Sequence, residues 1–376
     1  VVTPGRELAL QSSTVLKDMG SGLRAMACYG GRAAMDEHRV LKQVRPQIIF
    51  GTPGRLNDHL SKGNFSPYHI KYLVIDEFDK CLEMGFQDEM SRLIQSLPGL
   101  RRHFLLSATE AEEIPRFVHM GRVEKIDYRM DEEQVPERVH IYKVESPVKD
   151  KLESLGMLLR SLGDQSTIVF LNYRDSVERT NKYLVEQGFS TSFFHGGLEQ
   201  KEREASLYRF SNGSANILVS TDLASRGLDI PDIDNIIHYH MPESEDGYIH
   251  RVGRTARWEA QGRAFFLLGP EEHIPEHVDA EVEDYEIPAV EELPMPAKPK
   301  MATIYIGKGK KDKISKGDIL GFLCKKGGLN SSEIGKIDVN DRYAYAAIAR
   351  PKLRSVLNNV KGEKIKGVKT IVEEVR

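Results

Sequence analysis

The segment Tyr72–Asp79 reads YLVIDEFD, four apolar residues followed by a cluster that contains three carboxylates. The apolar part does not alternate with polar residues, which is typical of a strand buried on both faces of a parallel sheet. Amphipathic helical stretches, such as Asp88–Ser96 and Ser176–Glu186, separate this run from others like it. The similar runs are Phe104–Ser107, Thr167–Leu171, Ile217–Thr221 and Ile236–His240. This alternation predicts an α/β fold with parallel sheets.

The α/β pattern occurs twice, which predicts two domains, at residues 1–129 and 140–270, joined by a connector at 130–139. Residues 271–300 contain ten acidic residues and five prolines. That composition predicts a linker that is extended and mostly unpacked. Residues 301–376 follow as a third domain, for which the helix and strand signals give the order βαββαβ. This order is that of a ferredoxin-like or RRM-like α+β module.

The charge of the chain is unevenly distributed. Residues 302–376 hold 17 Lys and Arg against 8 Asp and Glu, a balance of +9, although the whole chain carries −3. A basic terminal module on an acidic body indicates a surface that binds polyanions, or alternatively a lysine-rich surface that serves solubility.

Composition excludes several classes of protein. No apolar run among the 376 residues approaches the roughly 18–20 that a membrane-spanning helix needs. The three cysteines, Cys28, Cys81 and Cys324, are far apart, which excludes a disulfide scaffold and a cysteine-rich zinc site and fits a reducing cytoplasm.

Two charged clusters are candidates for chemistry on a nucleotide. Asp76 and Glu77 follow a buried strand, where the first carboxylate suits a hydrated Mg²⁺ and the second a positioned water. Residues 250–257, HRVGRTAR, hold a histidine and three arginines. Arginines three residues apart on one helical face can reach a triphosphate across a cleft. A solvated basic helix is the simpler alternative for this segment.

Taken in order, these elements resemble the DEAD-box RNA helicases over about residues 1–268. The matching segments are TPGRELA at 3–9, Gly30-Gly31, TPGR at 52–55, DEFD at 76–79, SAT at 107–109, Gln200 with Arg203, STDLASRGLD at 220–229 and YIHRVGRTAR at 248–257. The resemblance implies two RecA-like domains that close around ATP and single-stranded RNA.

The resemblance also implies roles for individual residues, with ATP and Mg²⁺ as cofactors. Asp76 would hold the Mg²⁺, Glu77 would orient the attacking water, and Asp79 would link to Ser107 and Thr109. The nucleotide would be contacted from the second domain by Arg254 and Arg257 as arginine fingers, together with His250, Gly227 and Asp229. RNA phosphates would be bound by Pro4, Arg6, Gly31, Thr52, Arg55, Gly196 and Thr221. Contacts of this kind carry no base information, so we expect little sequence preference.

The chain departs from the family pattern at single positions. Phe78 replaces an alanine, Gly197 an aspartate, Ala256 a glycine and Gly5 a threonine. The sequence also contains no G-x-x-x-x-G-K-[ST] phosphate loop and begins at Val1, directly at the motif that should follow that loop. We expect from this that the chain is a truncated form of a longer protein, and that it hydrolyses ATP weakly or not at all.

The C-terminal module resembles the RNA-binding domain of the DbpA subgroup, for example in MATIYI at 301–306 and IGKID at 334–338. In that subgroup the domain is associated with a hairpin of large-subunit ribosomal RNA, which implies a role in ribosome assembly. Tyr343 and Tyr345 fall at positions where an RRM stacks bases, although strand tyrosines also serve plain cross-strand packing. Lysines of the module are expected to contact phosphates: Lys308, Lys310, Lys311, Lys313, Lys325 and Lys326.

These observations predict an ATP-dependent RNA helicase that opens short duplexes, acts as a monomer and binds no membrane. The alternative is a non-enzymatic RNA-binding or annealing protein with a degenerate helicase core.

Overall fold

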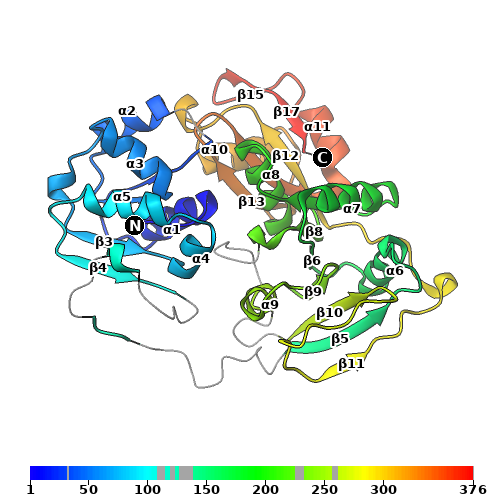
Figure 1. The fold of residues 1–376 in the computed structure, drawn as a ribbon. Coiled ribbons are helices and arrows are strands. Elements are labelled where there is room, and N and C mark those ends of the chain that lie inside the picture. The colour runs from blue at the N-terminus through cyan, green and yellow to red at the C-terminus, as the bar shows by residue number, and fades with distance from the viewer. Residues whose placement is uncertain are drawn as a thin grey trace. The chain divides into compact units, whose positions relative to one another are not determined.

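A computed structural model describes residues 1–31, 34–107, 115–118, 123–126, 139–224, 233–255 and 261–375 (Figure 1). The described residues fall into two compact units, one ending at Ile126 and the other beginning at Val139. The second unit holds an α/β domain and the C-terminal module. Among the described residues, none of the helices combines the length and the apolar composition that a membrane span requires.

The first unit is built on a parallel sheet. Its strands are β1 (Ala25–Cys28), β2 (Ile48–Gly51), β3 (Tyr72–Ile75) and β4 (Arg102–Leu105), and its helices are α1 (Arg6–Asp18), α2 (Ala34–Val44), α3 (Pro53–Ser61), α4 (Phe78–Glu83) and α5 (Gln87–Gln95). Strand β1 pairs with β2 and β3 pairs with β4. Val2 bridges both pairs, because it lies parallel to Gly51 on one side and to Ile75 on the other. The start of the chain therefore lies in the middle of this sheet.

The α/β domain of the second unit has a seven-stranded parallel sheet in the order β11-β5-β10-β9-β6-β8-β7. Its strands are β5 (Val139–Glu145), β6 (Thr167–Phe170), β7 (Thr191–Phe194), β8 (Ile217–Ser220), β9 (Asn235–His238), β10 (Gly262–Leu268) and β11 (Val282–Asp284). The helices are α6 (Leu152–Leu162), α7 (Arg174–Glu186), α8 (Gln200–Ser211) and α9 (Glu245–Val252). Every residue of β6, β8 and β9 is buried, as the lack of polar–apolar alternation in these runs predicts.

The C-terminal module is a four-stranded antiparallel sheet with two helices. The sheet order is β13-β14-β12-β17, from β12 (Met301–Ile306), β13 (Ile334–Val339), β14 (Ala344–Ala349) and β17 (Val372–Glu374). The helices are α10 (Lys316–Lys325) and α11 (Leu353–Asn359), and a short hairpin is formed by β15 (Lys364–Ile365) and β16 (Val368–Lys369). The last strand of the predicted βαββαβ order is represented by two short strands, β16 and β17. Strand β4 also differs from its prediction, since it begins at Arg102 and ends at Leu105.

The expectation that residues 271–300 form an unpacked tether is wrong. Strand β11 of this segment extends the parallel sheet next to β5. Lys151, which is 2% exposed, donates hydrogen bonds to the carbonyls of Tyr239 and Leu267 and pairs with Glu272. Arg160 donates to the carbonyl of Pro294 at 2.7 Å. The acidic, proline-rich segment is therefore fixed along the second α/β domain.

Candidate active site and RNA interface

The carboxylate cluster of the first unit sits on a tightly fixed turn between β3 and α4. The backbone N–H of Asp76 donates to the carbonyl of Val2 at 2.9 Å, and the N–H of Phe78 donates to the carbonyl of Leu106 at 2.9 Å. Between them, Glu77 adopts a left-handed conformation with φ of 48°, and its N–H donates to Asp76 Oδ1 at 3.0 Å. Non-glycine residues are uncommon in the left-handed region of the backbone, because this conformation costs free energy. Residues with such strain are found often at functional sites.

Phe78 shows how the chain accommodates a ring where the family has alanine. The side chain is 1% exposed and belongs to the core cluster of the first unit with Ile75 and Cys81. The ring points into the domain interior, so the carboxylates on either side of it remain at the surface end of the strand.

The turn concentrates negative charge. Burial raises the pKa of the Asp76 carboxyl, and the neighbouring Asp79 carboxylate raises it further. Burial also raises the pKa of the Cys81 thiol to about 12, with the carboxylates of Glu77, Asp79 and Asp76 adding to the effect. Carboxylate oxygens that repel one another in this way suit a hard cation such as Mg²⁺, which takes one or two carboxylates and keeps several waters. Ser107 lies exposed just after β4, whereas Thr109 is outside the described residues.

The residues expected to bind RNA in the first unit meet at the carboxyl ends of β1 and β2. Thr52 begins helix α3, and its N–H donates to the carbonyl of Cys28 at 3.3 Å. Arg6 begins α1 and brings its guanidinium against Gly30, where an added Cβ would lie 3.5 Å from Nη2. Pro4 is buried beside it and Gly31 has φ of 87°, a value that favours glycine.

Two residues that the sequence analysis missed hold Arg55 in this region. Glu37 is 5% exposed and accepts the N–H of Tyr29 at 3.1 Å, and its other oxygen lies 2.8 Å from His59 Nε2 and 3.4 Å from Arg55 Nε. His59 is fully buried, and its Nδ1 lies 2.7 Å from the amide of Asn64. The sequence placed Glu37 and His59 on amphipathic helices but did not indicate that their side chains are buried. Their position alone does not distinguish them from surface residues.

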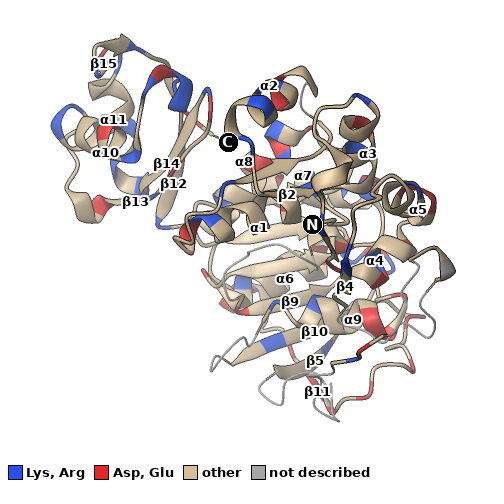
Figure 2. Cartoon of the chain, turned by 90° about the vertical axis from the view of Figure 1, so that its left-hand side faces the viewer, with Lys and Arg blue, Asp and Glu red and all other residues tan. Residues whose placement is uncertain are grey.

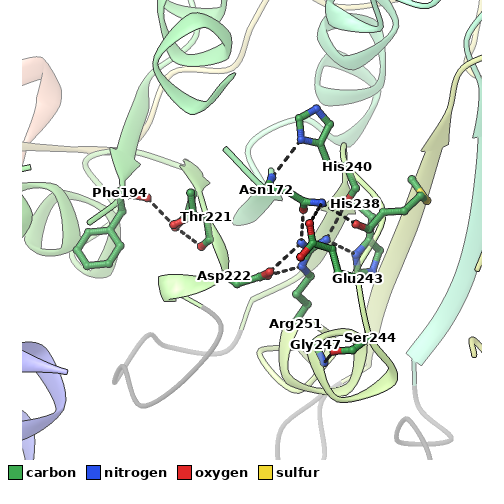
Figure 3. A network of polar contacts seen from close by, with 12 residues as sticks. Asn172, Phe194, Thr221, Asp222, His238, His240, Glu243, Ser244, Gly247 and Arg251 are labelled. Carbon is green, nitrogen blue, oxygen red and sulfur yellow. Dashed lines mark hydrogen bonds and ion pairs between the residues drawn. The ribbon is translucent and has the colours of Figure 1, made fainter. Parts of the chain in front are cut away.

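A buried arginine organises the corresponding edge of the second unit (Figure 3). Arg251, on α9, is 0% exposed and donates to both carboxylate oxygens of Asp222, at 2.5 and 3.1 Å. It also donates to Asn172 Oδ1 at 2.8 Å and to the carbonyl of His240 at 2.8 Å. These contacts tie α9 to the ends of β6, β8 and β9, so the network fixes the helix on which His250 lies.

The two residues expected to bind RNA in the second unit are brought together at neighbouring strands. The N–H of Thr221, just after β8, donates to the carbonyl of Phe194 at 3.3 Å, at the end of β7. Arg203 of α8 is 6% exposed and donates to the carbonyls of Gly196 at 2.7 Å and Leu198 at 3.2 Å, which fixes the loop between β7 and α8. The departure at Gly197 has a steric reason: a Cβ there would lie 3.1 Å from His195 Nδ1.

The remaining nucleotide contacts are described in part. His250 lies on α9 with Nε2 3.1 Å from Asp246 Oδ1, and Arg254 follows the end of the helix and is 9% exposed. Gly227, Asp229 and Arg257 are outside the described residues.

The sheet face of the C-terminal module packs against helix α8. Tyr345 is 2% exposed and stacks on Tyr208 with ring centroids 5.1 Å apart. The hydroxyl of Tyr343 donates to Glu204 at 2.6 Å, and Lys201 Nζ lies 5.1 Å from the ring centroid of Tyr305. Of the two positions expected to stack RNA bases, Tyr345 is thus covered by the chain itself, and Tyr343 is half-buried with its hydroxyl bound to α8. Lysine and arginine residues recur along the module (Figure 2), and Lys310, Lys311 and Lys313 are exposed.

Comparison with known proteins decides the family. Residues 1–117 match the DEAD/DEAH box helicase family, residues 150–259 match the helicase conserved C-terminal domain, and residues 303–374 match the DbpA RNA binding domain. Over 98% of its length the chain is 34% identical to the ATP-dependent RNA helicase DbpA of Escherichia coli (strain K12), of which it covers 82%. The chain is a DEAD-box RNA helicase of the DbpA subgroup.

Further relatives agree with this assignment. The helicase is 30% identical to the ATP-dependent RNA helicase DbpA of Bacillus subtilis (strain 168), with the same shares of both chains covered. Among solved structures, S. cerevisiae Dbp5 bound to RNA and ADP BeF3 superimposes with a TM-score of 0.63 at 25% identity over 76% of each chain. The predicted fold class, two RecA-like domains followed by an RRM-like module, is confirmed. As a member of this family the protein belongs to the ATP-hydrolysing RNA helicases, rather than to the non-enzymatic annealing proteins considered as the alternative. That this chain, without the phosphate loop, hydrolyses ATP weakly or not at all stays a prediction.

Proposed function

We propose that this helicase opens short RNA duplexes during assembly of the large ribosomal subunit, with ATP and Mg²⁺ held at the DEFD turn. Asp76 would bind the hydrated cation, Glu77 would orient water toward the terminal phosphate, and Asp79 would connect the turn to Ser107 and Thr109. The observation that supports this assignment is the fixed left-handed turn, in which burial and the neighbouring Asp79 carboxylate raise the pKa of Asp76. A cation at that position would relieve the repulsion between carboxylates.

In the second domain, Arg254 and Arg257 would stabilise the charge that develops on the phosphates, and His250, Gly227 and Asp229 would complete the nucleotide contacts. The network around Arg251 supports this part of the proposal, because it fixes the helix that precedes Arg254.

RNA would be bound through its phosphates. The track would run over Pro4, Arg6, Gly31, Thr52 and Arg55 on the first domain, and over Gly196 and Thr221 on the second. Glu37 and His59 support the first group, since they hold the guanidinium of Arg55 in one orientation.

The target would be chosen by the C-terminal module at residues 301–376, which would bind a ribosomal RNA hairpin. Since α8 covers Tyr345 and binds the hydroxyl of Tyr343, we assign this binding to the lysines, and base stacking on these tyrosines would require the module to leave α8. We further propose domain boundaries at 129, 140, 270 and 301, a monomer, and a cytoplasmic location, which the free thiols of Cys28, Cys81 and Cys324 support.

The hairpin assignment can be tested with two double variants of the full chain. Lys310→Gln with Lys313→Gln removes two exposed cations of the module that make no ion pair within the described residues, and Lys149→Gln with Lys182→Gln removes two exposed cations of the α/β domain. We expect the first variant to weaken binding of a large-subunit ribosomal RNA hairpin, measured by fluorescence anisotropy, and to lower the salt slope of log K by roughly 0.7–0.9 per lost contact. Equal effects of both variants would contradict a hairpin site on the module.

The metal assignment can be tested by a thermal shift with Mg²⁺ alone. We expect Mg²⁺ to raise the melting temperature of the wild-type chain but not of Asp76→Asn. The exposed Asp88, at the start of α5, provides the control Asp88→Asn, which should keep the wild-type response. An unchanged Mg²⁺ response in Asp76→Asn would contradict the assignment.

A further inference from the structure

A polar cavity of about 280 Å³ lies where the edge of the second α/β domain meets the C-terminal module. Strand β7 and the ends of α7 and α8 form one wall, and residues of β12, β17 and the turn before α11 form the other. The lining includes Arg209 and Arg350, the carboxylate of Glu374, and the hydroxyl residues Ser190, Thr191, Ser214 and Thr303. None of these residues belongs to the nucleotide site or to the RNA track described above.

Arg209 is the unusual member of this lining. Its Nε is buried and has no hydrogen-bond partner, and its guanidinium makes no ion pair or hydrogen bond within the described part of the chain. Buried charged groups in folded proteins are normally paired, because removing a charge from water is costly unless an opposite charge or hydrogen bonds replace the water. Within the described residues, the buried Nε of Arg209 is therefore a donor without an acceptor.

Arg350 adds a second positive charge to the same cavity. Its Nε donates to the carbonyl of Pro299 at 2.8 Å and its Nη2 to the carbonyl of Ser214 at 3.1 Å, so the side chain is held in place by neutral acceptors. Burial lowers the pKa of Arg209, and the neighbouring positive charge of Arg350 lowers it further, while Glu374 opposes the shift. Among the described lining residues, two guanidinium groups stand against one carboxylate, a balance of +1.

The other walls suit an anion that brings an organic group with it. Phe189, Phe193 and Val185 line the cavity beside the arginines and keep the surroundings apolar, which strengthens a charge-assisted hydrogen bond. A guanidinium donates in a planar fork that matches two oxygens of one phosphate group. The side chains of Thr303 and Ser214 are already joined by a hydrogen bond of 2.9 Å and add polar atoms at the rim.

We propose that this cavity binds a phosphate group, with Arg209 as the main ligand and Arg350 as the second cation. The phosphate could belong to the backbone of bound RNA or to a free phosphate compound, and both use the same chemistry. A backbone phosphate would place RNA across the junction between the second helicase domain and the module. That second step rests on the proposed function, whereas binding of inorganic phosphate does not depend on it.

The test uses the full chain with Arg209→Gln and, as the matched control, Arg354→Gln, which removes an exposed arginine from α11. Inorganic phosphate is titrated against chloride at equal ionic strength, with melting temperature and isothermal calorimetry as readouts. We expect phosphate to stabilise the wild type and the control, and its affinity to fall at least tenfold in Arg209→Gln. In phosphate-free buffer we expect Arg209→Gln to be at least as stable as the wild type, because it removes a cation whose Nε is buried without a hydrogen-bond partner in the described residues. Arg209→Lys keeps the charge and should retain part of the phosphate response.

A second measurement identifies the source of the phosphate. If it belongs to RNA, the salt slope of log K for a single-stranded oligonucleotide falls by roughly 0.7 in Arg209→Gln. If that slope is unchanged while the response to inorganic phosphate is lost, the cavity binds a free phosphate compound. A phosphate response in Arg209→Gln equal to that of the wild type would overturn the proposal, whatever the outcome of the RNA and Mg²⁺ experiments.

Discussion

The network around Arg251 makes a sharp prediction for Arg251→Gln. The guanidinium is 0% exposed, makes two hydrogen bonds to Asp222, and makes one each to Asn172 and to the carbonyl of His240. Removing one partner of a buried ion pair costs about 3–5 kcal/mol, because the other partner is left without a counter-charge. The side chain of Asp222 is 40% exposed and can regain water. We therefore expect a loss at the lower end, about 3 kcal/mol.

This loss can be measured by urea unfolding of the full chain, with fluorescence of Trp258, the sole tryptophan, and circular dichroism as probes. With a slope of about 2 kcal/mol per molar urea, the midpoint should fall by about 1.5 M. Arg179→Gln is the matched control, because Arg179 also pairs with an aspartate but its side chain is 61% exposed. An exposed pair contributes less than about 1 kcal/mol. If Arg251→Gln shifts the midpoint no more than Arg179→Gln, the reasoning from burial is refuted.

Three further predictions concern buried titratable groups. Burial and the charge of Arg251 hold the pKa of His238 well below its usual value, so the unfolded chain takes up a proton that the folded chain refuses. The free energy of unfolding should therefore fall as pH drops below about 6.5, by up to about 1.4 kcal/mol per pH unit. Urea midpoints measured at several pH values should depend less on pH for His238→Gln than for the wild type. Lys151→Met removes the contact with Glu272 that holds the segment at 271–300, together with the hydrogen bonds to the carbonyls of Tyr239 and Leu267. We therefore expect about 2–3 kcal/mol of lost stability and faster proteolysis of the segment, and an unchanged cleavage rate would contradict this role. Since the pKa of Asp76 is raised in the fold, ionisation of this group lowers stability as pH rises through that pKa. In Mg²⁺-free buffer at pH 7, Asp76→Asn should consequently have a higher melting temperature than the wild type. A lower melting temperature for this variant would contradict a destabilising Asp76 carboxylate.

The sequence was most informative where a residue's environment depends on its close neighbours in the chain. Runs of β-branched residues located β6, β8 and β9 to within a residue or two. A strand that is buried on both faces must be mostly apolar, so its sequence identifies it. Strand β4 was misplaced because its exposed Arg102 belongs to the strand only through pairing with Tyr72. Strand ends are set by the partner strand, which no local pattern reveals.

Long-range partners explain the remaining differences. The segment at 271–300 looked unpacked because its acidic residues gave no hint that Lys151, 121 residues earlier, would pair with Glu272. In the HRVGRTAR segment, spacing placed three arginines near one another but did not reveal that Arg251 faces inward toward Asp222. Tyr345 was equally ambiguous, because whether a strand tyrosine stacks on a base or on Tyr208 depends on a helix outside the module.

The contact between α8 and the tyrosine face of the module has a consequence for motion. Tyr208 of α8 stacks on Tyr345 of the module, so movement of the module away from the second helicase domain would require these rings to separate. If the module binds RNA as proposed, the distance from that RNA to the second helicase domain is then set by this contact and not by a fluctuating tether. Such an enzyme would act at a fixed offset from its anchor, and lengthening the acidic segment would leave that offset unchanged.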